Sequence, residues 1–279
     1  RKPHVMKPDW LKIDLSSDRQ SENTSGIIHA NRLHTICESG LCPNRAECWR
    51  LGTATLMIGG NICTRHCRFC NTPSGRPLPL DGDEPQRVAE SVKEMNLKYV
   101  VLTSVDRDDL PDMGAEHWRQ TVEAVRQLCP AKIEVLLPDF QGRDDLMDIV
   151  LLSRPDVVAH NIETVRRLTP VVRSVATYEG SLHVLRHIHE QGFVARSGLM
   201  LGLGEAEAEV LRTLRDLRDS GVDRVTIGQY LQPTAHHLPV AAYIAPDKFR
   251  WYRDQALQMG FSSAVSGPLV RSSYKAGMD

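Results

Sequence analysis

The stretch CTRHCRFC, from Cys63 to Cys70, places three cysteines at C-x3-C-x2-C spacing just after the β-rich run Thr55–Ile58. A short loop with this spacing can turn several thiolates toward one centre, which is what an iron–sulfur cluster requires. Because the loop follows a strand, it lies at the strand's C-terminal end, where barrels of alternating strands and helices carry their active sites. The stretch therefore predicts a metal centre on the rim of such a barrel.

A second cysteine triplet, formed by Cys37, Cys42 and Cys48, has C-x4-C-x5-C spacing (CESGLCPNRAEC). Each triplet supplies three ligands, one fewer than the four that saturate a tetranuclear iron–sulfur cluster. A fourth position that is left to another ligand is a place where chemistry can occur. The seventh cysteine, Cys129, stands at the end of a predicted helix and is interpreted as a structural free thiol.

The composition excludes several classes of protein. The chain has 279 residues, a formal net charge of -1 and 5% aromatic residues, so no global field favours nucleic acid or an anionic membrane. No apolar run reaches the length of about 18 residues that a membrane span needs. The first residues (RKPHVMKPDWLK) lack the apolar core of a secretory signal. We therefore expect a cytoplasmic protein, in which clustered thiols indicate metal binding or catalysis more often than disulfides.

Short β-rich runs alternate with amphipathic helical stretches from Gly52 onward. The predicted strands are Thr55–Ile58, Tyr99–Thr103, Ile133–Leu137, Val157–Ala159, Val194–Met200 and Arg224–Ile227. The predicted helices are Pro85–Met95, Ala115–Leu128, Asp144–Ser153, Tyr178–Gln191 and Ala206–Ser220. Six strands with five crossover helices favour an α/β fold in which a parallel sheet curls into a partial (β/α)6 TIM-type barrel. A further helix, Pro246–Met259, and a short run, Ser262–Val265, follow.

The flanking segments are interpreted as extensions of one structural domain. Residues 1–51 carry the first triplet and have too little periodic apolar sequence to fold alone. Residues 52–228 form the predicted barrel, and residues 229–279 hold a Pro/His-rich loop and a polar tail. We expect both extensions to pack over the C-terminal face of the strands, where they would shield a reactive site from solvent.

The loop from Cys63 to Cys70, with an aromatic residue before its last cysteine, resembles the cluster loop of radical S-adenosylmethionine (SAM) enzymes. The alternative is a zinc knuckle, because C-x2-C pairs are common in structural zinc sites. No second pair with zinc spacing follows in the sequence, which favours the radical SAM interpretation. The resemblance implies a [4Fe–4S] cluster on Cys63, Cys67 and Cys70, whose fourth iron binds SAM.

The first triplet, within HTICESGLCPNRAECW and followed by GTATLMI, resembles the lipoyl synthase family within that superfamily. The resemblance extends from KPDWLK at Lys7–Lys12 through TSVDRDD, HNIET and GLMLGLGE to the tail RSSY. It implies an auxiliary [4Fe–4S] cluster held by Cys37, Cys42, Cys48 and Ser273. Without the resemblance, the tail would be interpreted as a solvated, fraying C-terminus.

Candidate SAM-binding residues follow the later strands. In TSVDRDD, T-S-V and charged residues stand where radical SAM proteins usually have a glycine-rich element. An arginine could pair with the SAM carboxylate through two parallel hydrogen bonds. The alternative is that the polar residues at these positions only solvate loops, cap helices or form surface ion pairs. The candidates are Thr103, Ser104, Asp106, Arg107, Asn161, Glu163, Arg173 and Arg196.

The resemblance implies the insertion of two sulfur atoms, at C6 and C8 of a protein-bound octanoyl-lysine group. The implied cofactors are two [4Fe–4S] clusters and SAM. The implied partners are octanoylated carrier proteins (E2 lipoyl domains of 2-oxoacid dehydrogenases and the glycine cleavage H protein), an electron donor such as ferredoxin or flavodoxin, and an iron–sulfur carrier for cluster repair. Binding to nucleic acid or membrane is not expected.

Two alternatives belong to other classes. A methylthiotransferase or a biotin synthase-like sulfur inserter would lack the C-x4-C-x5-C triplet combined with an RSSY tail. A non-enzymatic zinc protein or cluster carrier would leave the six predicted strands unexplained.

Overall fold

The computed structural model describes residues 7–11 and 19–278, which belong to two compact units. Lys12, the last residue of the KPDWLK stretch, lies outside the described residues. The β1–β5 unit contains residues 19–66, 71–159 and 273–278. The β6–β8 unit contains residues 7–11, 67–70 and 160–272.

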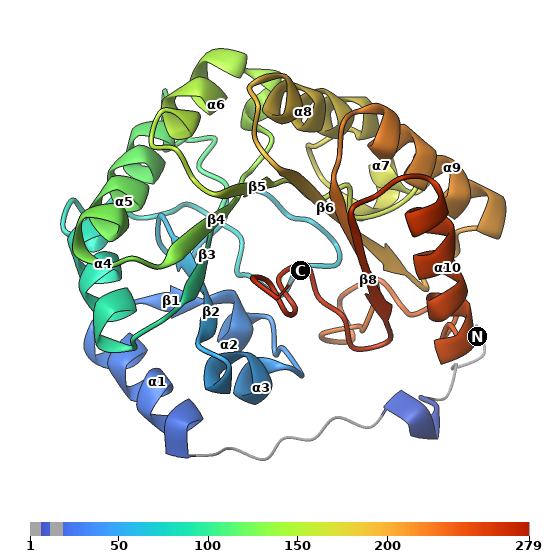
Figure 1. Cartoon of the computed structure of the whole chain (residues 1–279), viewed down its shortest axis with the longest axis horizontal. Coiled ribbons are helices and arrows are strands. Elements are labelled where there is room, and N and C mark those ends of the chain that lie inside the picture. The colour runs from blue at the N-terminus through green and yellow to red at the C-terminus, as the bar shows by residue number, and fades with distance from the viewer. Residues whose placement is uncertain (1–6, 12–18, 279) are drawn as a thin grey trace. The chain divides into compact units, whose positions relative to one another are not determined.

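The β1–β5 unit is built around four parallel strands that follow one another in chain order. They are β2 (Thr53–Ile58), β3 (Tyr99–Ser104), β4 (Lys132–Leu136) and β5 (Val157–Ala159). The crossover helices are α4 (Glu84–Glu94), α5 (Ala115–Leu128) and α6 (Asp144–Leu151). Figure 1 shows these helices along one side of the strands. A short 3-10 helix, Phe140–Gly142, follows β4.

Burial explains why these segments form strands and helices. Every residue of β2 is buried, as expected for a parallel strand that is covered on both faces. In α5 the buried residues Trp118, Val122 and Val125 recur at helical spacing and form its apolar face. The predicted strands and helices of this unit are present within about two residues of their predicted bounds.

The segment before β2 has more structure than the sequence suggested. It forms α1 (Arg19–Ala30), the short strand β1 (His34–Thr35), α2 (Ile36–Ser39) and α3 (Arg45–Arg50). Strand β1 pairs antiparallel with β2, with His34 opposite Met57 and Thr35 opposite Leu56. This pairing places the Cys37 segment beside the middle of β2.

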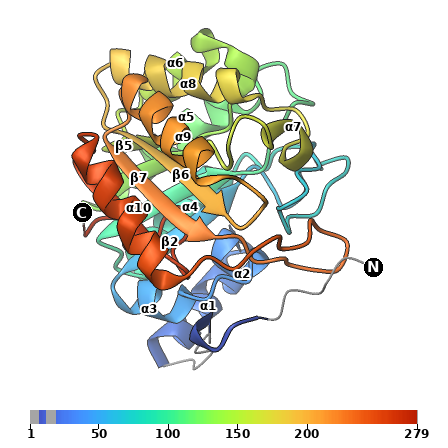
Figure 2. The same ribbon diagram turned by 90° about the vertical axis from the view of Figure 1, so that its right-hand side faces the viewer.

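The β6–β8 unit contains three parallel strands and the helices that connect them. Its strands are β6 (Ala195–Leu201), β7 (Arg224–Gln229) and β8 (Ser263–Gly267). Its helices are α7 (Thr169–Val172), α8 (Tyr178–Glu190), α9 (Glu207–Asp219), α10 (Pro246–Gln258) and the 3-10 helix Asp9–Leu11. Figure 2 shows α9 and α10 beside β7. Leu214, Ile227 and Phe249 lie in the common core of these elements.

Both units have the repeated strand–helix order with parallel strands that was predicted for a partial TIM-type barrel. All six predicted strands and five crossover helices occur, and the run after the last predicted helix forms β8. The boundaries predicted for the two extensions stay a prediction. Within residues 7–11 and 19–278, none of the helices has the length and apolar character that crossing a membrane would require.

Candidate metal centres

Cys63 lies on a loop that backbone hydrogen bonds close into a fixed shape. Its N–H donates to the Pro73 carbonyl at 2.8 Å, and its carbonyl accepts from Gly75 N–H at 2.9 Å. The Cys63 sulfur accepts hydrogen bonds from the N–H groups of Arg65 at 3.4 Å and Asp106 at 3.3 Å. Two donors aimed at one sulfur stabilise a thiolate, as a metal ligand must be.

The surroundings of Cys63 oppose a bare thiolate. Burial, followed by the nearby Asp106 carboxylate, raises the pKa of the Cys63 thiol to about 12. The protonated thiol donates to Asp106 Oδ2 at 3.6 Å. Burial in turn raises the pKa of Asp106. A bound metal cation replaces the thiol proton and neutralises the thiolate charge that burial and Asp106 disfavour. The residues therefore fit a metal-bound sulfur better than a free anionic sulfur.

Arg65, between Cys63 and Cys67, holds the loop to two later segments. Its guanidinium donates to both oxygens of Asp108 at 2.8 Å and to Asp139 at 2.8 Å, while Asp106 lies 3.4 Å away. The Arg65 side chain is only 3% exposed. The sequence reasoning missed this residue, whose buried ion pairs stabilise the geometry of the cysteine loop.

Cys67 and Cys70 belong to the β6–β8 unit, where the backbone between them is bound on two sides. Arg68 N–H donates to the Val172 carbonyl at 2.9 Å, and its carbonyl accepts from Leu238 N–H at 3.2 Å. The Cys67 sulfur lies 3.8 Å from the Ser174 hydroxyl. His237 Nε2 lies 2.9 Å from the Cys70 carbonyl, so this histidine supports the loop through its backbone.

The second triplet is assembled by α2, the turn after it and α3. Cys42 N–H donates to the Cys37 carbonyl at 3.0 Å, and Cys48 lies on α3. Burial raises the pKa of Cys37 to about 12 and that of Cys48 to about 11, and the neighbouring Cys42 contributes to both shifts. The Cys42 sulfur therefore lies close enough to disfavour ionisation of both Cys37 and Cys48. Bound cations would remove this penalty, which fits a cluster site.

The carboxyl-terminal tail reaches this triplet. The Ser273 hydroxyl lies 2.8 Å from the Thr55 hydroxyl on β2. The backbone N–H and the hydroxyl of Thr55 both hydrogen-bond to the Cys37 sulfur, and Lys275 N–H donates to the Cys48 sulfur. The structure thus brings Ser273 next to the cysteines with which the resemblance groups it.

The tail does not fray. The Tyr274 hydroxyl donates to the Glu47 carboxylate on α3 at 3.1 Å, and Ala276 is fully buried against Tyr99 and Val101. A Cβ at Gly277 would lie 2.4 Å from the Tyr99 ring. Tyr99 and Val101 are the first and third residues of β3, so this part of the tail contacts the amino-terminal half of that strand.

Within the described residues, no three His, Cys, Asp or Glu side chains converge on the position of a single metal ion. A tetranuclear cluster does not need such convergence, because its thiolates bind different iron atoms.

Four of the candidate SAM-binding residues lie at the end of β3 or directly after it. Thr103 donates weakly to the Leu136 carbonyl at 3.4 Å, and the buried Ser104 hydroxyl has no hydrogen-bond partner among the described residues. Asp106 contacts Cys63, as described above. The Arg107 guanidinium donates hydrogen bonds to the Gly59 and Leu78 carbonyls and to the Asp109 carboxylate. This arginine therefore holds the loop that follows β2.

The other four candidates lie in the β6–β8 unit. Burial raises the pKa of Glu163, whereas Arg173 and the Asn161 side chain act in the opposite direction. Arg173 donates to Ser181 at 2.7 Å and to the Asn161 carbonyl at 3.2 Å, and its Nε has no partner among the described residues. Arg196 is 1% exposed, so a surface ion pair does not explain it. Asn161, Glu163 and Arg173 thus form one partly buried polar group.

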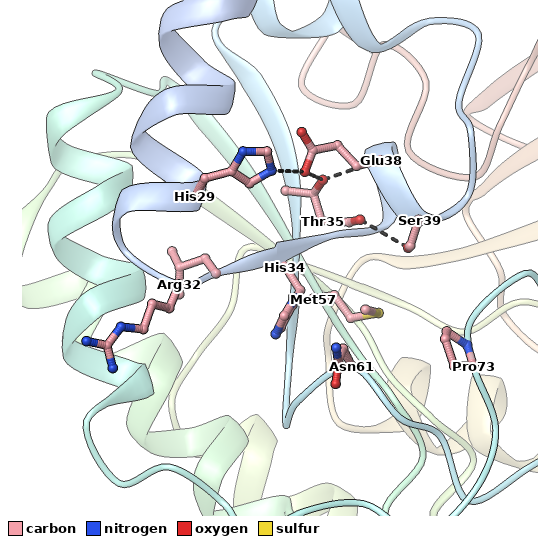
Figure 3. Close-up of a pocket in the computed structure, with 10 residues that line it drawn as sticks. His29, Arg32, His34, Thr35, Glu38, Ser39, Met57, Asn61 and Pro73 are labelled. Carbon is pink, nitrogen blue, oxygen red and sulfur yellow. Dashed lines mark hydrogen bonds and ion pairs between the residues drawn. The ribbon is translucent and has the colours of Figure 1, made fainter.

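A pocket of about 480 Å³ lies in the β1–β5 unit, between the Cys37 segment and the Cys63 loop. Figure 3 shows His34 and Met57 on the neighbouring strands β1 and β2, and Asn61 and Pro73 on the loop that follows β2. His29 and Glu38, 3.3 Å apart, lie on the side of α1 and α2. The full lining is His29, Arg32, Leu33, His34, Thr35, Glu38, Ser39, Met57, Asn61 and Pro73.

Comparison with known proteins agrees with this arrangement. A family model for the radical SAM superfamily matches residues 57–217. The lipoyl synthase of Parabacteroides distasonis is 56% identical, over 98% of this chain and 98% of its own length. The lipoyl synthase of Porphyromonas gingivalis is 55% identical, with the same coverage of both chains.

Solved structures share the fold at low sequence identity. Methylornithine synthase (PylB) has a TM-score of 0.59 at 15% identity and covers 90% of this chain and 79% of its own. Streptococcus suis SuiB bound to its precursor peptide SuiA has a TM-score of 0.62 at 11% identity and covers 88% and 52%. These likenesses confirm the predicted fold class, a partial TIM-type barrel. Two [4Fe–4S] clusters and SAM are the cofactors of lipoyl synthases, in agreement with the two cysteine triplets, and the chain belongs to the lipoyl synthase family of the radical SAM superfamily.

Proposed function

We propose that this protein inserts sulfur at C6 and C8 of an octanoyl group that is carried in amide linkage on a lysine of a lipoyl carrier protein. The observation that carries the proposal is that the carboxyl-terminal tail reaches the first triplet, with Ser273 and Cys37 both beside Thr55 and Lys275 beside Cys48. Two distinct cysteine sites match a reaction that needs both a radical generator and a sulfur source.

The substrate explains why cofactors are required. Methylene and methyl C–H bonds resist acid–base chemistry, so the reaction needs a cofactor-derived radical. When bound, one cluster supplies the electron that cleaves SAM to methionine and a 5′-deoxyadenosyl radical, and the other supplies the sulfur. One SAM is consumed for each C–H bond that is cleaved.

The chain's own residues divide these tasks. Cys63, Cys67 and Cys70 hold the radical-generating cluster, and Arg65 keeps their loop in place through its buried ion pairs. The residues proposed to contact SAM are Thr103, Ser104, Asp106, Arg107, Asn161, Glu163, Arg173 and Arg196.

Cys37, Cys42, Cys48 and Ser273 hold the auxiliary cluster. A serine oxygen is a harder ligand than a thiolate and suits iron–sulfur iron less well. A weaker fourth ligand fits a cluster that must open to give up sulfur. A cluster that gives up its sulfur would be consumed, so repeated turnover would require an iron–sulfur carrier. A ferredoxin or flavodoxin is the proposed electron donor.

The pocket between the Cys37 segment and the Cys63 loop is the proposed path of the octanoyl-lysine arm. Leu33, Met57 and Pro73 give it apolar surface, and each methylene buried there contributes about 0.8 kcal/mol. Asn61 and Ser39 offer polar groups for the amide that joins the acyl chain to lysine. Lipoyl domains of E2 proteins and the glycine cleavage H protein are the proposed carriers.

The proposed compartment is the cytoplasm. All seven cysteines are free in the structure, which suits a reducing environment.

The substitution Ser273→Ala tests the assignment of the two sites. It should leave 5′-deoxyadenosine formation measurable while strongly reducing sulfur insertion into an octanoyl-lysine peptide, as read by mass spectrometry. Cys63→Ala should abolish both products. Full sulfur insertion by the Ser273→Ala protein would contradict the proposed role of the tail.

A further inference from the structure

Thr55 contacts both the tail and the first triplet through one side chain. Its hydroxyl lies 2.8 Å from Ser273 Oγ, across 218 positions of sequence. Hydrogen bonds from the same hydroxyl and from the Thr55 N–H partly offset the burial that raises the pKa of the Cys37 thiol, which places Thr55 beside this cysteine. Thr55 is only 3% exposed and lies in the middle of β2, so its position is fixed by the strand.

The hydrogen-bonding capacity of a hydroxyl determines how these contacts combine. A threonine hydroxyl carries one hydrogen and two acceptor lone pairs. When its hydrogen points to the Cys37 sulfur, its oxygen accepts from the Ser273 hydroxyl. In the cluster-free chain this one hydroxyl therefore links Ser273 Oγ to Cys37 Sγ.

The other tail contacts hold the backbone but not the Ser273 side chain. Tyr274 binds Glu47, Lys275 N–H binds the Cys48 sulfur, and Ala276 packs on Tyr99. These contacts bring the tail to the site. Among the contacts described for Ser273, the bond to Thr55 is the one that sets the direction of its hydroxyl.

We propose that Thr55 is a positioning residue of the auxiliary site, holding Ser273 Oγ and Cys37 Sγ in the relative geometry that lets both bind one cluster. This inference rests on the proposed function for the assignment of the ligands. The interaction between Thr55 and Ser273 can nevertheless be measured without any cluster.

The first test uses the cluster-free full chain. Thr55→Val keeps the shape of the side chain and removes its hydroxyl, and Ser273→Ala removes the partner. In a double-mutant cycle on the thermal unfolding midpoint, the two losses should not add, because both variants remove the same hydrogen bond. Additive losses would overturn the proposed contact, whether or not the protein binds a cluster.

The second test measures cluster retention in a Cys63→Ala/Cys67→Ala/Cys70→Ala background, where auxiliary iron is counted alone. After anaerobic reconstitution, an iron chelator should remove iron from Thr55→Val several-fold faster than from the unaltered protein. Thr55→Ser restores the hydroxyl and should restore retention. Thr53→Val, two residues earlier on the same strand and also buried, is the matched control and should not change the rate.

The outcomes separate the two claims. The positioning role would be refuted if Thr55→Val lost iron at the same rate as the unaltered auxiliary site. It would also be refuted if Thr53→Val accelerated iron loss as much as Thr55→Val does. If no protein of the series binds auxiliary iron, the ligand assignment in the proposed function fails, and the double-mutant cycle still decides whether Thr55 positions Ser273.

Discussion

Arg65 and Asp108 form a bidentate ion pair in which Nε and Nη2 of the arginine each lie 2.8 Å from a carboxylate oxygen. The pair joins the loop of Cys63 to the segment after β3. Since Arg65 also binds Asp139, one buried guanidinium connects three segments that are far apart in the sequence.

Replacing Arg65 by Met should destabilise the protein strongly. Removing one partner of a buried ion pair typically costs about 3–5 kcal/mol, because the remaining carboxylates lose their compensating charge. Arg65→Lys keeps the charge but cannot make the two parallel bonds, so its loss should be intermediate. Urea unfolding of the cluster-free protein measures both.

The matched control is Arg119→Met, which removes an exposed arginine that pairs with Glu116 and Glu123 on α5. Exposed pairs contribute little, so this variant should unfold almost like the unaltered protein. Similar losses for the Arg65 and Arg119 variants would contradict the structural role of Arg65.

Asp108 should make stability depend on acid pH. Burial opposes ionisation, but hydrogen bonds from Arg65 and Gln141 outweigh it and lower the pKa of Asp108 from 3.8 to about 2. A lowered pKa contributes stability that is present above the ordinary value and is lost as the pH falls toward about 2. The difference in unfolding free energy between the unaltered protein and Asp108→Asn should therefore shrink between about pH 4 and pH 2. An advantage that stays constant over this range would show that the ionised carboxylate is not what matters.

Gly228 on β7 should not tolerate a side chain. A Cβ at this position would lie 2.0 Å from the Val270 carbonyl oxygen, so Gly228→Ala must displace the turn that leads into the tail. We expect a loss of about 1–3 kcal/mol in unfolding free energy. Gly26→Ala on α1, where no atom lies within 4 Å of the added Cβ, is the control and should be neutral or stabilising. A neutral Gly228→Ala would contradict this close packing.

Tyr274→Phe should loosen the tail without unfolding the protein. The substitution removes the hydroxyl that donates to Glu47, a bond worth about 1 kcal/mol. Backbone amides of residues 273–278 should exchange several-fold faster by hydrogen-exchange mass spectrometry, while those of β3 stay protected. Glu47→Gln combined with Tyr274→Phe should give less than the sum of the two effects. Unchanged exchange in the tail would show that this bond does not hold it.

Strongly periodic segments were predictable from the sequence. The bounds of α5 (Ala115–Leu128) and β5 (Val157–Ala159) agree with the prediction, because their apolar patterns and end signals are clear. Helix α1 was missed, since RQSENTSGIIHA is mostly polar and has no strong apolar face. Strand β1 has only two residues, too few for any periodicity, and its pairing with β2 is a tertiary contact.

The candidate sites were predictable only in part, for a related reason. Cysteine spacing is local, so both triplets can be recognised in the sequence. Arg65, Glu47 and Thr55 act through partners that lie 43, 227 and 218 positions away, and no local pattern marks them. Ser273 was identified through the family resemblance alone. Arg107 stays a predicted SAM contact, and its charged group binds Gly59, Leu78 and Asp109.

The most direct test of the account is to reconstitute the protein anaerobically with iron and isotopically heavy sulfide, and then add SAM, a reductant and an octanoyl-lysine peptide. Mass spectrometry of a single turnover should show two heavy sulfur atoms in the peptide, together with methionine and 5′-deoxyadenosine. A protein that lacks Cys37, Cys42 and Cys48 should form 5′-deoxyadenosine without thiolated peptide. Sulfur insertion that persists without this triplet, or a peptide that never gains sulfur, would contradict the central claim.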